Sequence, residues 1–276
     1  MSNPYYKQHW IDIEPERHAA YDQILGFHPA LEPIIRPLQL QPGLRVLDVG
    51  SGPAHTTMEL ARRVAPSGKV TGVDINAEFI ARSTARAREA KLPLEFTHSG
   101  FPPLPFPDAG FDRVFCKNVL EYVDSAAATV AEMARVTAPG GIVVASDSDW
   151  DLLVLETGAA NRERNERVLT ASKSIAIKEP RIGRMLYGLF RAAGLVDVKV
   201  EIMAGADTVG RALPMLTASF ARYAHDSGCI ADEEIAAWLA SLNRAIEQGS
   251  FFFVLPQFVA RGSKNDDGEI RGAGPR

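Results

Sequence analysis

The sequence has little cysteine and no long apolar run. Its two cysteines, Cys116 and Cys229, lie far apart and no C-x-x-C motif occurs, which argues against a disulfide framework and a zinc knuckle. No apolar stretch approaches the roughly 20 residues that span a bilayer, since FFFVL at 251–255 is far too short. The segment MSNPYYKQHW at the start lacks the apolar core of a signal peptide. We therefore expect a cytoplasmic protein without a membrane span.

An excess of positive charge is also absent, because the net charge is −4. A chain without a basic excess lacks the electrostatic footprint that duplex nucleic acid requires, so we expect no nucleic-acid partner. No histidine has partners in the sequence that suggest metal ligation; we expect His18, His28 and His98 to be structural and no metal to bind. What is present is an ordinary globular composition with 46% hydrophobic residues, which suits one large domain or a domain with appended pieces.

Strand and helix patterns alternate in the first half of the chain. Short hydrophobic runs are each followed by a segment with helical periodicity. We expect strands at 44–50, 69–75, 94–99, 111–118 and 139–149, and helices at 58–65, 78–90 and 128–137. Strands at this spacing predict parallel βαβ units, which wind into an open α/β sheet with helices on both faces.

The second half of the chain is more helical. Pro180 and Gly194 punctuate a helix over 179–195, and the alternating segment 196–202 predicts a strand with one wetter face. A last strand is expected at 250–262, where Pro256 indicates a bulge or an edge position. The other expected helices lie at 155–178, 210–225 and 232–248.

The motif RVLDVGSGPAHTT at 45–57 marks the ligand site. It follows the first expected strand, and in an open α/β sheet ligands bind at the carboxyl ends of strands where the strand order reverses. Gly50 and Gly52 have no Cβ, so a ligand can lie directly on their backbone. Asp74, at the end of the next strand, can accept hydrogen bonds from a ribose diol and would repel a 2′-phosphate. These residues predict an adenosine-containing ligand with free ribose hydroxyls.

Two kinds of ligand compete for this turn. A nicotinamide dinucleotide uses G-x-G-x-x-G, but His55 occupies the position of the third glycine. Asp48 would also lie near the pyrophosphate, whereas a cationic ligand favours an acid at that place. The alternatives are a Rossmann oxidoreductase that uses NAD or a nucleotide sugar, and a binding module that performs no chemistry.

Four motifs in order carry a resemblance to a known family. VLDVGSGPAHTT, VTGVDIN, LPFPDAGFDRVFCKNVLEYV and VTAPGGIVVAS together resemble the class I S-adenosylmethionine-dependent methyltransferases. The small-molecule group of menaquinone and ubiquinone biosynthesis methyltransferases is the most similar, and the resemblance covers about residues 40–146. It implies a Rossmann-like, seven-stranded, mostly parallel sheet whose last strand is antiparallel. It also implies S-adenosylmethionine as cofactor and a small organic molecule as methyl acceptor.

The resemblance also implies roles for individual residues. Asp48 and the backbone of Gly50, Ser51 and Gly52 would hold the methionine part of the cofactor, and Asn118 would lie near it. Asp74 would bind the ribose and Ile75 would pack on the adenine. The family's carboxylate for the adenine amino group is missing, because Gly100 and Phe101 occupy that place; their backbone groups, or Ser99, are the expected substitutes.

Catalytic and substrate-binding residues are less well marked. Asp147 and Asp149, just past the fifth strand, are candidates for a general base, although they can equally be loop and cap residues; His55 is a third candidate. Arg181 and Arg184 are candidates for binding an anionic substrate, although a solvated helix start also accounts for them. Further candidates for contact with substrate are the aromatic residues Tyr5, Tyr6, Trp10 and Trp150.

The expected organisation places helical segments around the cofactor domain. Residues 1–40 would form a helical lid, and 41–204 the cofactor-binding core. A helical insertion at 205–249 would form the roof over the substrate, and 250–262 would return to the sheet. The polar, glycine-rich segment 263–276 would be a disordered tail.

Overall fold

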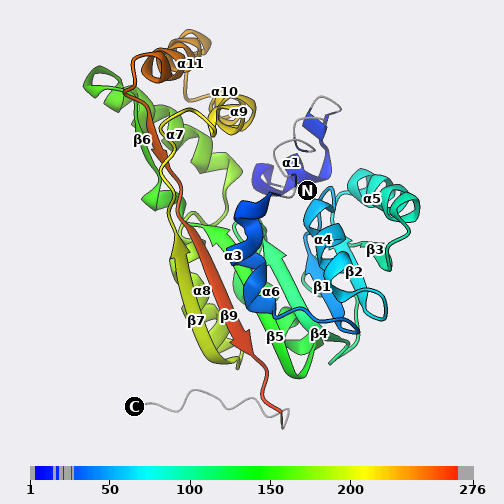
Figure 1. Ribbon diagram of the computed structural model, residues 1–276. Helices are drawn as coiled ribbons and strands as arrows, with labels where there is room; N and C mark the ends of the chain where they lie inside the picture. The colour runs from blue at the N-terminus through cyan, green and yellow to red at the C-terminus, as the bar shows by residue number, and fades with distance from the viewer. Residues whose placement is uncertain (1–3, 15–16, 19–20, 22–25, 27, 267–276) are drawn as a thin grey trace, which may run out of the picture.

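A seven-stranded sheet forms the centre of the molecule (Figure 1). The computed structural model describes residues 4–14, 17–18, 21, 26 and 28–266. The strands are β1 (Arg45–Val49), β2 (Lys69–Asp74), β3 (Leu94–His98), β4 (Phe111–Lys117), β5 (Thr137–Ser148), β7 (Val196–Met203) and β9 (Gln257–Ser263). Their order is β3-β2-β1-β4-β5-β9-β7, and only β9 runs antiparallel to its neighbours. The predicted mostly parallel sheet with an antiparallel last strand is confirmed.

Helices cover both faces of this sheet, as expected. The helices are α3 (Glu32–Ile35), α4 (His55–Val64), α5 (Ala77–Ala90), α6 (Ala126–Val136) and α8 (Ile182–Ala192). Successive side chains of a strand point to opposite faces, so Val46 packs in a core with α3 and α4, while Leu47 packs in a core with α6 and α8. Both faces are therefore apolar, which explains the near-continuous hydrophobic runs of the parallel strands.

The strand order reverses beside β1. Its neighbours are β2 on one side and β4 on the other, so the crossovers from β1 to β2 and from β3 to β4 diverge at its carboxyl end. The turn 50–54 lies at this divergence, where α/β sheets bind ligands.

A separate helical layer stands beyond the carboxyl ends of the parallel strands (Figure 1). It contains α7 (Arg162–Ala176), α9 (Leu213–Met215), α10 (Ala221–Asp226) and α11 (Asp232–Glu247), with a π-helical turn at Leu216–Phe220. Its apolar cluster is built around the fully buried Trp238 and includes Trp150, Val168 and Leu242. The layer draws on α7 as well as on the 205–249 segment, because one continuous core joins them.

The prediction of a single strand over 250–262 is wrong. Its first part is β8 (Phe252–Val254), which pairs with β6 (Val154–Glu156) in a small antiparallel sheet; its second part is β9 of the main sheet. Pro256 lies between the two strands, and β9 is an inner strand, so neither an edge nor a bulge accounts for this proline. A residue without an N–H fits this place because the chain leaves one sheet there and enters another.

The two ends of the chain differ from expectation in detail. Helix α1 (Tyr5–Ile11) is present, while parts of the expected lid lie outside the described residues. Ser263, in the expected tail, closes β9, and the Lys264 ammonium donates to the carbonyl groups of Ala134, Arg135 and Thr137. Residues 267–276 lie outside the described part. Within the described ranges, no helix combines the length and the hydropathy that a bilayer crossing requires.

Candidate functional site

The glycine turn and two carboxylates meet at the carboxyl ends of β1 and β2. Val49 pairs with Val73 in the parallel register, so the turn after β1 passes beside the end of β2. The backbone N–H groups of Gly50 and Ser51 donate to the Val73 carbonyl at 2.8 and 3.1 Å. The Gly52 N–H donates to the Asp74 carboxylate at 2.7 Å. The turn is therefore fastened to β2 by backbone and side-chain bonds.

Glycine is required at both positions of this turn, for different reasons. Gly50 and Gly52 have φ angles of 73° and 49°, in the region where other residues are strained. A Cβ on Gly50 would come within 2.2 Å of Val119 Cγ2, so protein packing excludes a larger residue. A Cβ on Gly52 would have no neighbour within 4 Å, and Gly52 lines a cavity. The space over Gly52 is thus open to a ligand.

This cavity brings together most of the predicted cofactor residues. Its volume of about 350 Å³ falls within the range of small-molecule sites. The predicted cofactor residues in its wall are Asp48, Gly50, Ser51, Gly52, Asp74, Ile75, Phe101 and Asn118. Gly100 is exposed and does not line the cavity. The role of each residue toward a cofactor stays a prediction.

Three polar atoms of wall residues lack an internal partner: Trp10 Nε1 at the aromatic end, and Ser51 Oγ and Asn118 Oδ1 beside the turn. Ser51 Oγ and Asn118 Oδ1 are buried and make no hydrogen bond with the residues that the structure describes. Unsatisfied buried polar groups cost free energy, so native proteins retain few of them without a functional reason. Together with the open space over Gly52, the two atoms beside the turn fit a polar ligand that lies along it, as S-adenosylmethionine would.

Burial makes both carboxylates of the turn hard to ionise. Asp48 is almost fully buried and accepts a hydrogen bond of 2.6 Å from the Thr57 hydroxyl. Burial raises its pKa to about 6, and the nearby Asp74 adds to that rise. Burial likewise raises the pKa of Asp74, against the hydrogen bonds from the backbone of Asn76 and Gly52. A cation placed between the two carboxylates would relieve this cost.

The other end of the cavity is an aromatic chamber. Of the predicted substrate residues, Trp10 and Trp150 line it. Tyr21, an amino-terminal aromatic residue that the sequence also offers for such a contact, lines it too, whereas the sequence analysis missed Tyr122, Phe220 and Tyr223 in its wall. They come from segments far apart in the sequence, and a helical aromatic residue looks the same in sequence whether it faces a core or a cavity. The chamber suits an apolar or aromatic molecule.

Tyr5, Tyr6 and Arg181 lie outside the cavity wall. The hydroxyl of Tyr5 donates to Asp226 of α10, and that of Tyr6 donates to Asp124 at 3.0 Å. Arg181 is exposed at the start of α8. The geometry therefore gives no support to direct substrate contact by these three residues, because their polar ends are engaged or directed elsewhere.

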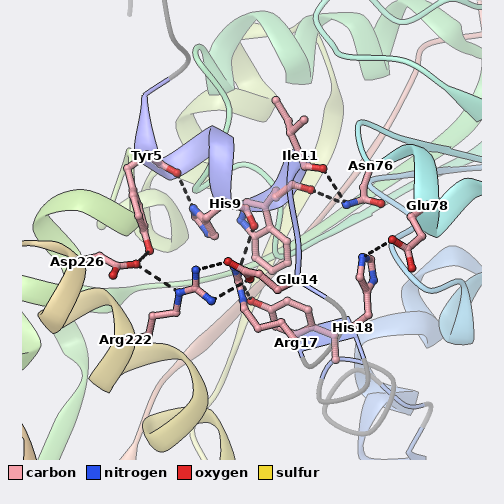
Figure 2. Close-up of polar contacts among 12 residues, drawn as sticks. Tyr5, His9, Ile11, Glu14, Arg17, His18, Asn76, Glu78, Arg222 and Asp226 are labelled. Carbon is pink, nitrogen blue, oxygen red and sulfur yellow. Dashed lines mark hydrogen bonds and ion pairs between the residues drawn. The ribbon is translucent and has the colours of Figure 1, made fainter.

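Helix α1 and the residues after it connect the helical layer to the sheet (Figure 2). On one side, the Arg222 guanidinium of α10 forms an ion pair with Glu14. On the other side, Asn76 Nδ2 donates to the carbonyl groups of Trp10 and Ile11 at 3.0 and 3.2 Å. We call residues 5–14 the strap. Since Trp10 lines the cavity, the strap forms part of its wall.

The three candidates for a general base have different surroundings. Asp147 and Asp149 are fully buried, but neither lines the cavity. Asp149 is bound by Arg184 at 2.5 and 2.7 Å, which is the structural role that the sequence left open. His55 begins α4 and lines the cavity, with Nε2 3.4 Å from Arg86. The geometry thus argues against a catalytic role for the two aspartates.

Glu121 is a buried carboxylate in the cavity wall that the sequence analysis missed. It is 1% exposed, and its carboxylate accepts a hydrogen bond from Trp150 Nε1. Burial raises its pKa to about 7. Lys117 of β4 also lines the cavity, and burial lowers its pKa. Both residues lie within the motif LPFPDAGFDRVFCKNVLEYV, and their place near the end of β4 was the signal from which they could have been predicted.

Among the described residues, no three His, Cys, Asp or Glu side chains are grouped to hold a metal.

Comparison with known proteins agrees with this geometry. A family model described as a methyltransferase domain matches residues 46–141. A demethylmenaquinone methyltransferase from Geobacillus stearothermophilus is 34% identical over 183 residues, which cover 61% of this chain and 77% of that protein. This chain belongs to the class I S-adenosylmethionine-dependent methyltransferases. The match with a relative over most of its length carries this assignment, which confirms the resemblance seen in the motifs.

Two further similarities add a relative in sequence and a solved structure with a similar fold. An uncharacterized 37.1 kDa protein in a transposon of Streptomyces fradiae is 37% identical over 43% of this chain, and the match spans 34% of that protein. The structure of a Haemonchus contortus phosphoethanolamine N-methyltransferase in complex with S-adenosyl-L-methionine superposes with a TM-score of 0.61 at 17% identity, covering 94% of this chain and 60% of that one. The second similarity supports the fold alone. Neither assigns an acceptor to this methyltransferase.

Proposed function

We propose that this chain binds S-adenosylmethionine along the turn after β1 and transfers its methyl group to a small organic molecule in the aromatic chamber. The observation that carries this proposal is the cavity that joins the two: Gly52 and Asp74 lie in the same wall as Trp10 and Tyr122. The bound cofactor supplies a methyl group on a positively charged sulfur, and its transfer requires no metal.

The roles of the turn residues follow from their geometry. Each carboxylate oxygen has two lone pairs, so Asp74 can accept bonds from ribose hydroxyls while it holds the N–H groups of Gly52 and Asn76. Asp48, unpaired with any cation within the described residues, would balance the positive charge of the ligand. Ile75 and Phe101 would pack on the adenine ring.

Orientation is the main contribution of the protein to methyl transfer. Holding an acceptor atom in line with the methyl group can lower a barrier by roughly 7–11 kcal/mol. The strap and the helical layer would keep water away from this contact.

Where the acceptor must lose a proton, Glu121 is better placed than Asp147 or Asp149, since it alone of the three lines the cavity. Its pKa of about 7 suits a group that accepts a proton near neutral pH.

The remaining expectations belong to this proposal as well. We infer that residues 1–40 serve as a lid and 205–249, together with α7, as a roof over the acceptor. The net charge of −4 favours a small molecule over a nucleic acid as acceptor. A cytoplasmic location stays a prediction.

Calorimetry with purified protein tests the proposal. S-adenosylhomocysteine should bind and NADH should not, because His55 replaces the third glycine of the dinucleotide motif. A panel of small hydroxyl, amine and carbon acceptors should then be screened for transfer of an isotope-labelled methyl group. Binding of NADH instead would point to an oxidoreductase, and binding of the cofactor without transfer to any acceptor would point to a binding module.

A further inference from the structure

Three lysines reach the cavity wall, and one of them has no partner. Lys7 forms an ion pair with Asp124 at 2.8 Å. Lys173 donates to the Trp150 carbonyl at 3.3 Å and lies 3.7 Å from Asp151. The ammonium group of Lys117 also reaches the cavity wall, but it makes no hydrogen bond and no ion pair with any residue that the structure describes. Its ammonium group is thus a positive charge in the wall that the protein leaves unmatched.

The carboxylates around the cavity do not form an ion pair with the Lys117 ammonium. Asp48 accepts from Thr57, Asp74 from the Gly52 N–H, and Glu121 from Trp150. Asp147, Glu121 and Asp48 attract the Lys117 ammonium only from beyond ion-pair distance, and burial lowers the pKa of Lys117 despite them. Burial also raises the pKa of Glu121 to about 7, so this carboxyl group is only partly ionised near neutral pH. An anion beside Lys117 would therefore meet limited repulsion.

A hydroxyl donor lies on the next strand. Lys117 of β4 pairs with Ser146 of β5, and Ser148 follows on the same face of that strand. Ser146 Oγ donates to Gln257 Oε1, and Gln257 Nε2 donates to Ser148 Oγ. Because Ser148 accepts this bond, its own hydroxyl proton remains available. Ser148 lines the cavity with Lys117, so an ammonium and a hydroxyl present donors to one space.

We propose that the methyl acceptor carries a carboxylate on an apolar, aromatic body, and that Lys117 and Ser148 bind this carboxylate. This inference rests on the proposed function, since it names the acceptor class of the same cavity. Two donors on adjacent strands match the two oxygens of a carboxylate, and the ion pair would balance the charge of the partly buried ammonium. Trp10, Tyr122 and Phe220 would surround the aromatic body.

The test compares benzoate with its neutral analogue benzamide on protein saturated with S-adenosylhomocysteine. In calorimetric or NMR titrations, the wild-type protein should bind benzoate more tightly than benzamide. Lys117→Met should weaken benzoate binding about tenfold or more, as expected for the loss of a charge-assisted hydrogen bond, and should leave benzamide binding unchanged. Lys117→Arg should retain most of the preference. Lys199→Met, at an exposed position of β7, removes the same charge far from the cavity and should change neither affinity.

Several results would overturn the inference. One contrary result is equal affinity of the wild-type protein for benzoate and benzamide; another is equal affinity of Lys117→Met and the wild type for benzoate. A third contrary result is that Lys117→Met weakens S-adenosylhomocysteine but not 5′-methylthioadenosine, which lacks the amino-acid part; Lys117 would then pair with the cofactor's own carboxylate. Failure of the proposed function is distinct, because S-adenosylhomocysteine would then not bind the wild-type protein. Thermal unfolding of each variant checks the fold, and loss of an unpaired, partly buried ammonium should not lower the unfolding temperature.

Discussion

The Asp74 carboxylate accepts a hydrogen bond of 2.7 Å from the backbone N–H of Gly52, which joins the end of β2 to the turn after β1. Its second oxygen accepts from the Asn76 N–H at 2.8 Å, just before α5 begins. One side chain thus fixes the turn and the start of the next helix, and it retains lone pairs that face the cavity. Pre-organisation of the turn and ligand binding depend on the same carboxylate.

Asp74→Ala should therefore weaken S-adenosylhomocysteine binding. Loss of two charge-assisted hydrogen bonds, each contributing about 1.5–3 kcal/mol, predicts a decrease of about 3 kcal/mol or more in the magnitude of the binding free energy, measured by calorimetry. Glu95→Ala is the matched control, because Glu95 is an exposed acid on the adjacent β3 that pairs with the exposed Lys69. An unchanged affinity in Asp74→Ala would remove Asp74 from the binding site.

The two glycines of the turn should respond differently to alanine. Gly50→Ala places a methyl group 2.2 Å from Val119 Cγ2, so we expect a loss of about 2 kcal/mol or more in the free energy of unfolding. Gly52→Ala meets no protein atom within 4 Å and should cost only about 1 kcal/mol of backbone strain.

The methyl group that Gly52→Ala adds would enter the cavity, however. It should lower the affinity for S-adenosylhomocysteine about tenfold or more. Denaturant unfolding and calorimetry on both variants separate the two effects. Tight cofactor binding by folded Gly52→Ala protein would contradict the placement of the ligand on this turn.

The raised pKa of Asp48 predicts a pH dependence with a definite sign. Its pKa is 3.8 ordinarily and about 6 in the folded protein, so the unfolded chain loses this proton first as the pH rises. The contribution of Asp48 to stability without ligand therefore falls between about pH 4 and pH 6 and is constant above that window.

Binding of a cation has the opposite dependence, since it favours the carboxylate. The affinity for S-adenosylmethionine should rise about tenfold from about pH 5 to about pH 7, with release of a proton detectable by calorimetry in buffers of different ionisation enthalpy. Asp48→Asn should flatten this slope. The slope that remains in Asp48→Asn would report Asp74 and Glu121, whose pKa values are also raised. An identical slope in both proteins would show that Asp48 does not titrate on binding.

The cofactor half of the cavity could be predicted from the sequence because its residues are local. Asp48, Gly50 and Gly52 fall within one motif, and Asp74 ends the next strand, so strand periodicity and the parallel register suffice to bring them together. The same periodicity predicted the open parallel α/β sheet, whereas its seven strands and antiparallel last strand were implied by the family resemblance. The break at Pro256 was missed because two strands of separate sheets read as one hydrophobic run.

The aromatic chamber could not be predicted in the same way. Trp10, Tyr122 and Phe220 meet through tertiary packing of the strap, the loop after β4 and the helical layer. Asp147 and Asp149 end a central strand, as a base would, but the loop after β4 covers Asp147 and Arg184 neutralises Asp149. Position in a strand does not reveal which neighbours shield a side chain.

The strap gives a last prediction. Arg222 and Glu14 are both more than one third exposed, so their ion pair should stabilise the closed strap by at most about 1 kcal/mol. Arg222→Ala should therefore increase the opening of α1 by up to about fivefold, seen as faster hydrogen exchange at the amides of Gln8 and Asp12. Added salt should also speed hydrogen exchange in α1 of the wild-type protein, because it screens the ion pair, and it should change exchange in Arg222→Ala little. Arg36→Ala, which breaks an exposed pair with Glu201, is the control and should leave exchange in α1 unchanged. Faster exchange throughout the sheet in Arg222→Ala would mean instead that the pair stabilises the whole fold, not the strap alone.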